Sequence, residues 1–448
     1  MAFNFVACDR DQELLLPPSL REWLAEDHLA WFVLDAVDAI DLGAIYAEYR
    51  DDGWGRAAFD PRMMVALLLY AYAVGERSSR QIERRCREDV AFRVICANRI
   101  PDHATIARFR VRHEQALAAT FTQVLVLSAR AGLVSVGVVA LDGSPISGNA
   151  SPGATRTYAA IREEVDAILE QAAETDAAED EQFRGARGDE LPTQLADRRS
   201  RLERLRRCRE ELEREEAEAQ AEYAAKLAWR ADWEAEHGRK LAGRKPTRPD
   251  PEGLVRRKVN TTDPDTRMIT RTGRRTVQGF NVQVVANPNQ IVLAAEVTQS
   301  INDGDQLEPM VDCAISELAR AGIEEPISAV LADGGYWNST QVAATRARHI
   351  DVLVPAKNRR RTQPRKNAPP QGDEARRMEA ILDTPAGQAR YRRRQQIVEP
   401  VFANIKYLRR IDRFQRRGLH ACQAEWKLIA ATHNLLKLWR ATRIPAAA

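Results

Sequence analysis

The amino-acid sequence predicts a protein of the α/β class, with an α+β mixed sheet, an all-helical N-terminal domain and a helical, coiled-coil-like insertion. Three observations lead to this prediction. Apolar residues recur at helical spacing through residues 18–132, short apolar runs typical of buried strands occur in 133–158 and again in 251–445, and a charged stretch with helical periodicity, within 159–250, separates the two groups of strands. We therefore expect one core whose sequence is interrupted by the insertion.

Composition limits the classes of protein to which the chain can belong. Its 448 residues are enough for two or three domains, and a hydrophobic content of 44% is that of a globular protein. We expect no membrane span, because no run of about 18 apolar residues occurs. The six Cys residues form no Cys-x-x-Cys pair and the seven His residues form no His-x-x-x-His pair, which indicates reduced thiols in a cytoplasm and argues against a zinc enzyme. A P-loop motif is also absent, so ATP is not expected as a cofactor.

Charge is distributed unevenly along the chain, although the net charge is only +3. Residues 357–417 contain 18 Lys or Arg and 6 Asp or Glu, whereas residues 161–236 contain 23 acidic and 13 basic residues. A basic segment of this size favours a polyphosphate partner. The acidic segment would repel nucleic acid, so we expect it to face away from such a partner or to contact a second subunit.

The N-terminal region predicts a helical DNA-binding domain after an irregular lead-in, 1–17. A buried helix over 63–74 begins at Asp60-Pro61, and three further helices follow: one capped by Ser78 or Ser79, a short one over 90–97, and one capped by Asp102. This succession resembles a helix-turn-helix unit, and the alternative is a helical bundle with a solvated arginine face. The arginines that would read DNA are Arg80, Arg84, Arg108 and Arg110.

The remaining elements are expected in the order of a mixed sheet. A strand over 134–141 precedes the insertion, whose hairpin turn we place at 185–192, and 238–250 reads as a basic linker. A turn at 260–265 is followed by a hairpin, a helix, a strand, a helix and another strand. These elements span 277–286, 291–297, 305–321, 327–332, 338–348 and 351–355. Residues 357–370 are basic and poor in apolar residues, and the last amphipathic helix covers 426–439.

Three acidic residues stand where a metal site is expected. Asp142 and Asp333 each follow a short apolar run and precede a glycine, which predicts a buried strand that ends in a turn. An acid at the carboxyl end of such a strand lies in the crevice where α/β sheets bind ligands. Glu399 lies among basic residues directly before Pro400, so we expect it at the start of a helix. Together they would form an all-oxygen site for Mg²⁺ or Mn²⁺, although a single Asp-Gly pair is often only a turn.

These residues resemble a known family. Asp142, Asp333 and Glu399, in that order, are similar to the acidic triad of bacterial insertion-sequence transposases of the Asp-Asp-Glu type, which have a ribonuclease-H-like core. Tyr391, Arg394, Glu399 and Lys406 match the Tyr, Arg, Glu and Lys of the family's C-terminal signature. Four residues separate Arg394 from Glu399 where the family has three. A continuous helix would turn Arg394 away from the Glu399 face, so we expect Pro400 to break the helix, with Arg393 or Arg392 as substitutes for Arg394.

The resemblance implies a function as well as a fold. It implies a DNA transposase that cleaves phosphodiester bonds and transfers strands at the ends of an insertion sequence, with Asp142 bridging two Mg²⁺ (or Mn²⁺) ions and Asp333 and Glu399 each holding one. Tyr336 and Trp337 would stack on an unpaired base, with core packing as the alternative. The residues expected to hold DNA phosphates are Tyr391, Arg394, Lys406, Arg409, Arg410 and Arg413.

We expect double-stranded DNA, both transposon ends and target, as the partner, no contact with a membrane, a homodimer or larger assembly on DNA, and a cytoplasmic, nucleoid-associated location. Two other functions remain open. One is a catalytically inactive DNA-binding remnant, and the other is a different ribonuclease-H-like nuclease.

Overall fold

We describe the fold from a computed structural model of the chain. The described residues are 19–49, 57–167, 193–241, 245–250, 258–270, 276–356 and 372–443. The lead-in 1–17, the insertion turn expected at 185–192 and the basic segment 357–370 lie outside them. None of the helices in the described ranges has the length and apolar character that crossing a membrane requires.

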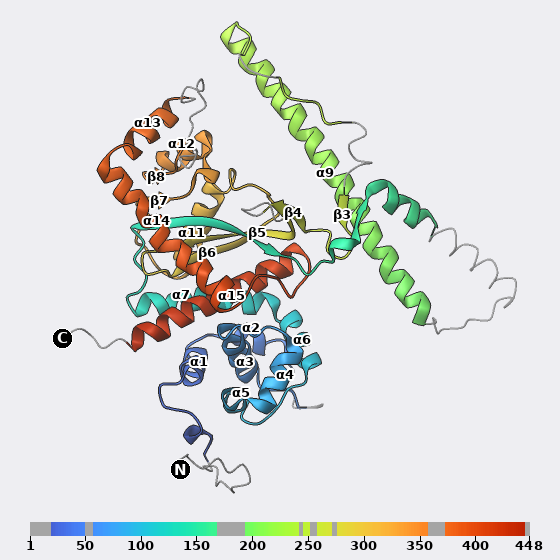
Figure 1. The fold of residues 1–448 in the computed structure, drawn as a ribbon, viewed down its shortest axis with the longest axis vertical. Coiled ribbons are helices and arrows are strands. Elements are labelled where there is room, and N and C mark those ends of the chain that lie inside the picture. The colour runs from blue at the N-terminus through green and yellow to red at the C-terminus, as the bar shows by residue number, and fades with distance from the viewer. Residues whose placement is uncertain are drawn as a thin grey trace, which may run out of the picture.

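All regular elements in the described part of the N-terminal region are helices, as the sequence predicted (Figure 1). Helix α3 begins where Asp60 accepts a hydrogen bond from the Arg62 backbone N–H (2.8 Å) and Pro61 occupies the first helical position. Helix α6 begins where Asp102 accepts from the Thr105 N–H (2.8 Å). The helices are α1 (Leu29–Asp38), α2 (Gly43–Tyr46), α3 (Pro61–Ala73), α4 (Ser79–Glu88), α5 (Val90–Ile95), α6 (His103–Arg112) and α7 (Glu114–Arg130).

A six-stranded mixed sheet forms the centre of the rest of the chain (Figure 1). Five strands follow the order β6–β5–β1–β7–β8, and β4, which the sequence did not predict, pairs with the start of β5. The pairings of β5 are antiparallel, whereas β1 with β7 and β7 with β8 are parallel. The strands are β1 (Val138–Ser147), β4 (Arg267–Thr270), β5 (Thr276–Ala286), β6 (Val292–Thr298), β7 (Ala329–Leu331) and β8 (Asp351–Leu353).

Strand β1 is longer than expected, because it runs past Asp142 to Ser147 and does not stop at an Asp-Gly turn. Its antiparallel partner β5 keeps it extended, with pairs from Ala140 opposite Ala286 to Ser147 opposite Gly279. The parallel pairing of β1 with β7 ends earlier, at Ala140. Asp142 therefore lies where β1 loses its parallel neighbour, which is the position at which α/β sheets bind ligands.

The described residues of the insertion form two helices with a small core of their own. Its long helix α9 (Thr193–His237) extends away from the sheet (Figure 1), and a helix over 158–167 packs against it. Arg267 of β4 forms ion pairs with Glu211 (3.2 Å) and Glu215 of α9, which hold this helix to the main sheet. The short strands β2 (Thr155–Thr157) and β3 (Lys258–Asn260) pair at its base. The core residues are Ile161, Val165, Leu205, Cys208, Leu212 and Val259.

The last helix, α15 (Leu419–Thr442), covers the free edge of β6. The Gln423 side chain accepts a hydrogen bond from the Val297 N–H (2.6 Å) and donates to the Ala295 carbonyl (2.9 Å). Further along the helix, Asn434 bonds both the N–H (2.8 Å) and the carbonyl (2.9 Å) of Val292. Because an exposed strand edge can pair with other chains, these two amides protect the sheet as well as anchoring the helix.

Asp263 and Asp265 anchor the start of the same helix. Asp263 accepts from the Gly418 N–H (3.2 Å) and Asp265 from the Leu419 N–H (2.7 Å), which supplies partners for two N–H groups at the start of α15. The turn that carries them is therefore structural. Other elements of the sheet domain are η3 (Gly334–Tyr336) and the helices α11 (Leu307–Arg320), α12 (Ser339–Ala347), α13 (Asp373–Leu382) and α14 (Pro385–Ala403).

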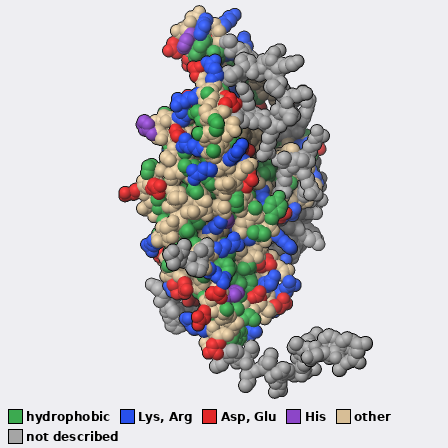
Figure 2. Space-filling model, turned by 60° about the vertical axis from the view of Figure 1, so that its left-hand side comes forward, with side chains coloured by type: hydrophobic (Ala, Val, Ile, Leu, Met, Phe, Trp, Pro, Cys, Tyr) green, Lys and Arg blue, Asp and Glu red, His purple; other side chains and the backbone are tan. Residues whose placement is uncertain are grey.

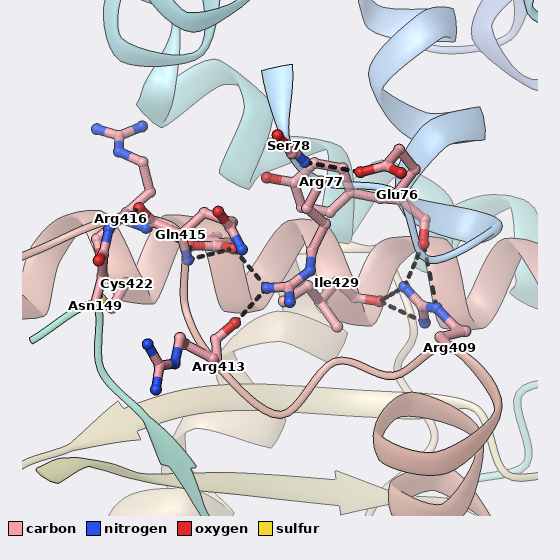
Figure 3. Close-up of polar contacts among 12 residues, drawn as sticks. Glu76, Arg77, Ser78, Asn149, Arg409, Arg413, Gln415, Arg416, Cys422 and Ile429 are labelled. Atoms are coloured by element: carbon pink, nitrogen blue, oxygen red, sulfur yellow. Dashed lines mark hydrogen bonds and ion pairs between the residues drawn. The ribbon is translucent and has the colours of Figure 1, made fainter. Parts of the chain in front are cut away.

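Buried arginines join the N-terminal helices to the sheet domain (Figure 3). The Arg409 guanidinium donates to the carbonyls of Tyr72 (3.0 Å) and Ile429 (3.3 Å), which lie on α3 and α15. Nearby, Arg77 pairs with Glu425 (3.0 Å), and both side chains are almost fully buried. The expectation that Arg409 binds a DNA phosphate is therefore wrong, because only 5% of this residue is exposed and its donors are used inside the protein.

The buried Arg77–Glu425 pair generates a prediction about stability. Glu425→Gln removes the negative charge and leaves the Arg77 cation buried without compensation, so the free energy of unfolding should fall by about 3–5 kcal/mol. Denaturant unfolding measures this change. The matched control is Asp38→Asn, which breaks the exposed Arg62–Asp38 pair (2.7 Å) and should cost less than about 1 kcal/mol. Equal losses of unfolding free energy in Glu425→Gln and Asp38→Asn would contradict the prediction that the buried Arg77–Glu425 pair is more important for stability than the exposed pair.

Candidate active site

Two of the acidic residues lie side by side on the central strands. The last parallel pair joins Ala140 of β1 to Leu331 of β7, so Asp142 and Asp333 each stand two residues beyond it. Asp333 caps the short helix η3, and its carboxylate accepts from the Gly335 N–H (2.8 Å). The register of the sheet thus brings both carboxylates to the same level of the crevice.

Helix α14 carries the third acidic residue, and it continues through Pro400 without a break. A proline has no N–H to donate to the carbonyl four residues earlier, which here belongs to Gln396. That carbonyl accepts a hydrogen bond from the Gln290 side chain (3.1 Å) instead. Glu399 therefore lies inside the helix, near its C-terminal end, and the expectation that it starts a helix is wrong.

Arg394 contacts two of the three acidic residues, Asp142 and Glu399, although its sequence spacing from Glu399 differs from that of the family. One guanidinium nitrogen, Nη1, lies 3.3 Å from Asp142 Oδ2, and the other, Nη2, lies 3.5 Å from Glu399 Oε1. The side chain of Arg394 is 8% exposed, whereas that of Glu399 is 51% exposed. The prediction that a continuous helix would turn Arg394 away from Glu399 is wrong, because the long side chain bridges the angular offset.

Burial also affects the pKa values of Asp142 and Arg394. Burial raises the pKa of Asp142 to about 6, Arg394 opposes that rise, and the nearby Asp333 carboxylate adds to it. Burial lowers the pKa of Arg394, but the surrounding carboxylates outweigh burial and raise it above its ordinary value. The guanidinium therefore remains charged and stabilises the ionised form of Asp142.

Lys406 approaches the site from the turn that follows α14. Residues Asn404–Leu408 form a π-helical turn, in which the Arg409 N–H donates to the Asn404 carbonyl (3.0 Å). The Lys406 ammonium donates to Ser144 Oγ and to the Pro145 carbonyl (2.9 Å), just beyond Asp142 on β1. The π turn thus places a cation against β1, two residues beyond Asp142.

Sequence reasoning missed a fourth carboxylate at the site. Asp303 precedes α11 and accepts hydrogen bonds from the side chains of Asn281 (2.8 Å) and Gln283 (2.8 Å) of β5. Gln283 in turn accepts from the Tyr336 hydroxyl. A signal was present, because two polar residues alternating in an otherwise apolar buried strand require polar partners.

Several residues expected to contact DNA serve the protein interior instead. Tyr336 is fully buried, so the expectation that it stacks on a base is wrong and the packing alternative holds. Trp337 is half-buried and packs against the same core. Arg110 donates to the Arg77 carbonyl (2.7 Å), the Tyr72 hydroxyl (3.2 Å) and Ser79, so it does not face outward as predicted. Tyr391 is half-buried, and the exposed arginines of the predicted set are Arg80, Arg84, Arg108, Arg410 and Arg413.

The donor set fits a hard divalent cation, because all three predicted ligands are carboxylates. In the described part of the chain, however, no three acidic, His or Cys side chains converge on one point. The Arg394 guanidinium lies between Asp142 and Glu399 and places a positive charge next to both carboxylates.

The helical N-terminal region and the mixed sheet define the general class, an α/β protein with carboxylates at the ends of two neighbouring parallel strands. Two family models then match the chain. Residues 18–112 match the Transposase domain (DUF772), and residues 256–435 match the Transposase DDE domain. The second match contains Asp333 and Glu399, whereas Asp142 lies between the two. No curated protein and no solved structure matches the chain.

Together the two matches span more than half of the chain, and they identify it as an insertion-sequence transposase of the DDE type. The chain is therefore an enzyme that acts on DNA by phosphoryl transfer, and its family uses divalent metal ions.

Gly143 offers a direct test of the site's packing. A Cβ atom at this position would lie 2.5 Å from Gln283 Nε2, 2.7 Å from Asp303 Oδ1 and 2.9 Å from the Tyr336 hydroxyl. Gly143→Ala should displace this network and the neighbouring Asp142, lowering the DNA cleavage rate by about 10- to 100-fold. Single-turnover cleavage measures the loss. Gly137→Ala is the matched control, since its Cβ would meet Ser328 Oγ at an ordinary 3.6 Å, and equal effects would contradict the prediction.

Proposed function

We propose that the sheet is a ribonuclease-H-like core in which Asp142, Asp333 and Glu399 hold two Mg²⁺ or Mn²⁺ ions. The strand order supports this proposal, since three antiparallel strands (β6, β5, β1) are followed by two parallel ones (β7, β8). The observation that carries it is the equal level of Asp142 and Asp333 on β1 and β7, with Glu399 connected to Asp142 through Arg394.

The proposed chemistry is cleavage at the ends of an insertion sequence, followed by strand transfer. Ions held by the three carboxylates would activate the attacking hydroxyl and stabilise the leaving oxygen. The protein contributes orientation: β1 and β7 hold two of the ligands in register, and α14 presents the third at the rim of the crevice. Lys406, fixed beside Ser144, would bind a phosphate near the cut.

The substrate of this reaction would be double-stranded DNA, at both the transposon ends and the target. Exposed arginines that would contact it lie on α4 and α6 and on the segment after α14. Figure 2 shows Lys and Arg side chains scattered over the middle of one face of the molecule, with more Asp and Glu side chains toward its lower end. Joining two ends implies a homodimer or larger assembly, acting on DNA in the cytoplasm.

The first test concerns the proposed ligands. Asp142→Asn, Asp333→Asn and Glu399→Gln should each abolish cleavage of end DNA while leaving DNA binding within a few fold, because each removes a metal ligand but no phosphate contact. Mg²⁺ or Mn²⁺ should support cleavage, and Ca²⁺ should support binding only. Parallel cleavage and binding assays measure both. Activity retained in EDTA would exclude the metal mechanism, and normal cleavage by one variant would exclude that residue.

The second test separates sequence reading from phosphate binding. Arg108→Ala on α6 should narrow the difference in affinity between end DNA and scrambled DNA, because a base contact is worth about 1–3 kcal/mol on the cognate site only. Arg413→Ala should weaken both DNAs equally and lower the salt slope by about one unit. Binding across a salt series distinguishes these outcomes.

Arg214→Ala on α9 is the control for that series. It should change neither the difference in affinity between end DNA and scrambled DNA nor the salt slope, because the acidic insertion is expected to face away from DNA. Proportional losses on both DNAs in Arg108→Ala would show that α6 does not read sequence.

A further inference from the structure

The position of Arg394 raises a question that the proposed function does not answer. Its guanidinium contacts Asp142 and Glu399 at 3.3 and 3.5 Å, so two of the three proposed metal ligands are already paired with a cation. In the described part of the chain, no three acidic side chains surround a common point. A metal ion held by these residues would therefore compete with the guanidinium for the Asp142 and Glu399 carboxylates.

Two details show that Arg394 is only partly satisfied where it lies. Its Nε atom is buried and has no hydrogen-bond acceptor among the described residues, which costs free energy in the absence of water. Its contact with Glu399 is long for a charge-assisted hydrogen bond. An arginine in this state is held by charge and can leave when another cation takes its place.

The structure also indicates how the Arg394 guanidinium can move away from Asp142. The Glu399 side chain is half exposed, so the outer end of the contact opens toward solvent, where DNA phosphates would approach. Arg394 sits on a continuous helix, and rotation of its long side chain alone can carry the guanidinium outward. On the inner side, Asp142 remains fixed in β1.

We propose that Arg394 is the internal counter-ion of the metal site, which competes with divalent cations for Asp142 and Glu399 and is released toward DNA phosphate when metal binds. This inference rests on the proposed metal-holding role of the three carboxylates. It assigns Arg394 two states. Without metal it neutralises the buried carboxylate, and with metal and DNA it neutralises a phosphate. Metal and DNA then strengthen each other's binding through this one side chain.

Mn²⁺ binding without DNA, followed by electron paramagnetic resonance, tests the competition. Arg394→Gln removes the competing cation, so its Kd for Mn²⁺ should fall by about tenfold relative to the unsubstituted chain. Arg390→Gln is the matched control, one turn earlier on α14, where Arg390 pairs with Asp351 (3.0 Å) outside the site, and its Kd should not change. Equal or weaker Mn²⁺ binding by Arg394→Gln would overturn the proposal.

Thermal unfolding with and without Mn²⁺ tests whether a change in Mn²⁺ binding by Arg394→Gln results only from loss of folding. Arg394→Gln should be less stable without metal and should gain more in Tm on adding Mn²⁺, since metal then restores the missing charge. Arg394→Lys, which keeps one charge but cannot bridge both carboxylates, should fall between the two chains in both measurements. A Tm gain from Mn²⁺ that is the same for all three chains would overturn the proposal.

The last measurement tests whether binding of a divalent cation strengthens binding of DNA. Ca²⁺ should strengthen binding of end DNA by a larger factor in the unsubstituted chain than in Arg394→Gln, and an equal factor would overturn the exchange. Asp142→Asn distinguishes this failure from that of the proposed function. If Asp142→Asn binds Mn²⁺ normally, the metal site itself is wrong. If it loses Mn²⁺ while Arg394→Gln behaves like the unsubstituted chain, only the counter-ion role is wrong.

Discussion

A carboxylate buried in the middle of a sheet must be balanced by positive charge, and that requirement governs the structure around Asp142. Burial, together with the nearby Asp333 and Asp303 carboxylates, raises its pKa to about 6 even with Arg394 beside it. An ionised side chain in this position is costly unless its charge is balanced, and the one sheet contact described for it, from the Gly143 N–H (3.0 Å), supplies a hydrogen bond but no charge. Helix α14 meets the requirement, because it packs against β1 and places a guanidinium on the carboxylate.

The geometry of α14 follows from the same requirement. The helix has to deliver Arg394 to the inside and Glu399 to the rim, and it must continue through Pro400 to do both. The carbonyl left free by that proline is satisfied by Gln290, which follows the turn between β5 and β6. The next turn widens into a π-helix, which brings Lys406 onto β1. The sheet and the helix are thus fitted to each other at three successive turns.

Sequence patterns predicted most of the scaffold, because caps and periodicity act locally. Asp60 and Asp102 mark helix starts through bonds to nearby N–H groups, and the register of β1 and β7 brings Asp142 and Asp333 together as expected. The length of β1 could not be predicted, since it is set by pairing with β5, a strand more than 130 residues later. A local pattern contains no information on such a partner.

Whether an individual arginine is buried or exposed could not be predicted from the sequence either. Arg409 and Arg410 are neighbours in one basic segment, yet the first is buried between α3 and α15 while the second is exposed. Charge density predicts that a segment is basic, but the difference between a buried cation and a solvated one depends on which carbonyls the fold leaves nearby. For Arg409 these are the carbonyls of Tyr72 and Ile429.

The buried junction also constrains how the two halves of the enzyme work together. Arg409 is held by carbonyls from both halves, and Gly75 lies so close that a Cβ atom there would be 2.5 Å from the Arg409 carbonyl oxygen. The Arg77–Glu425 pair adds a second fastening between α4's N-terminal side and α15. A surface on α4 and α6 is therefore held in a fixed relation to the acidic crevice. If those helices bind the transposon end, the distance from the recognised sequence to the cut is set by this rigid junction, not by a linker.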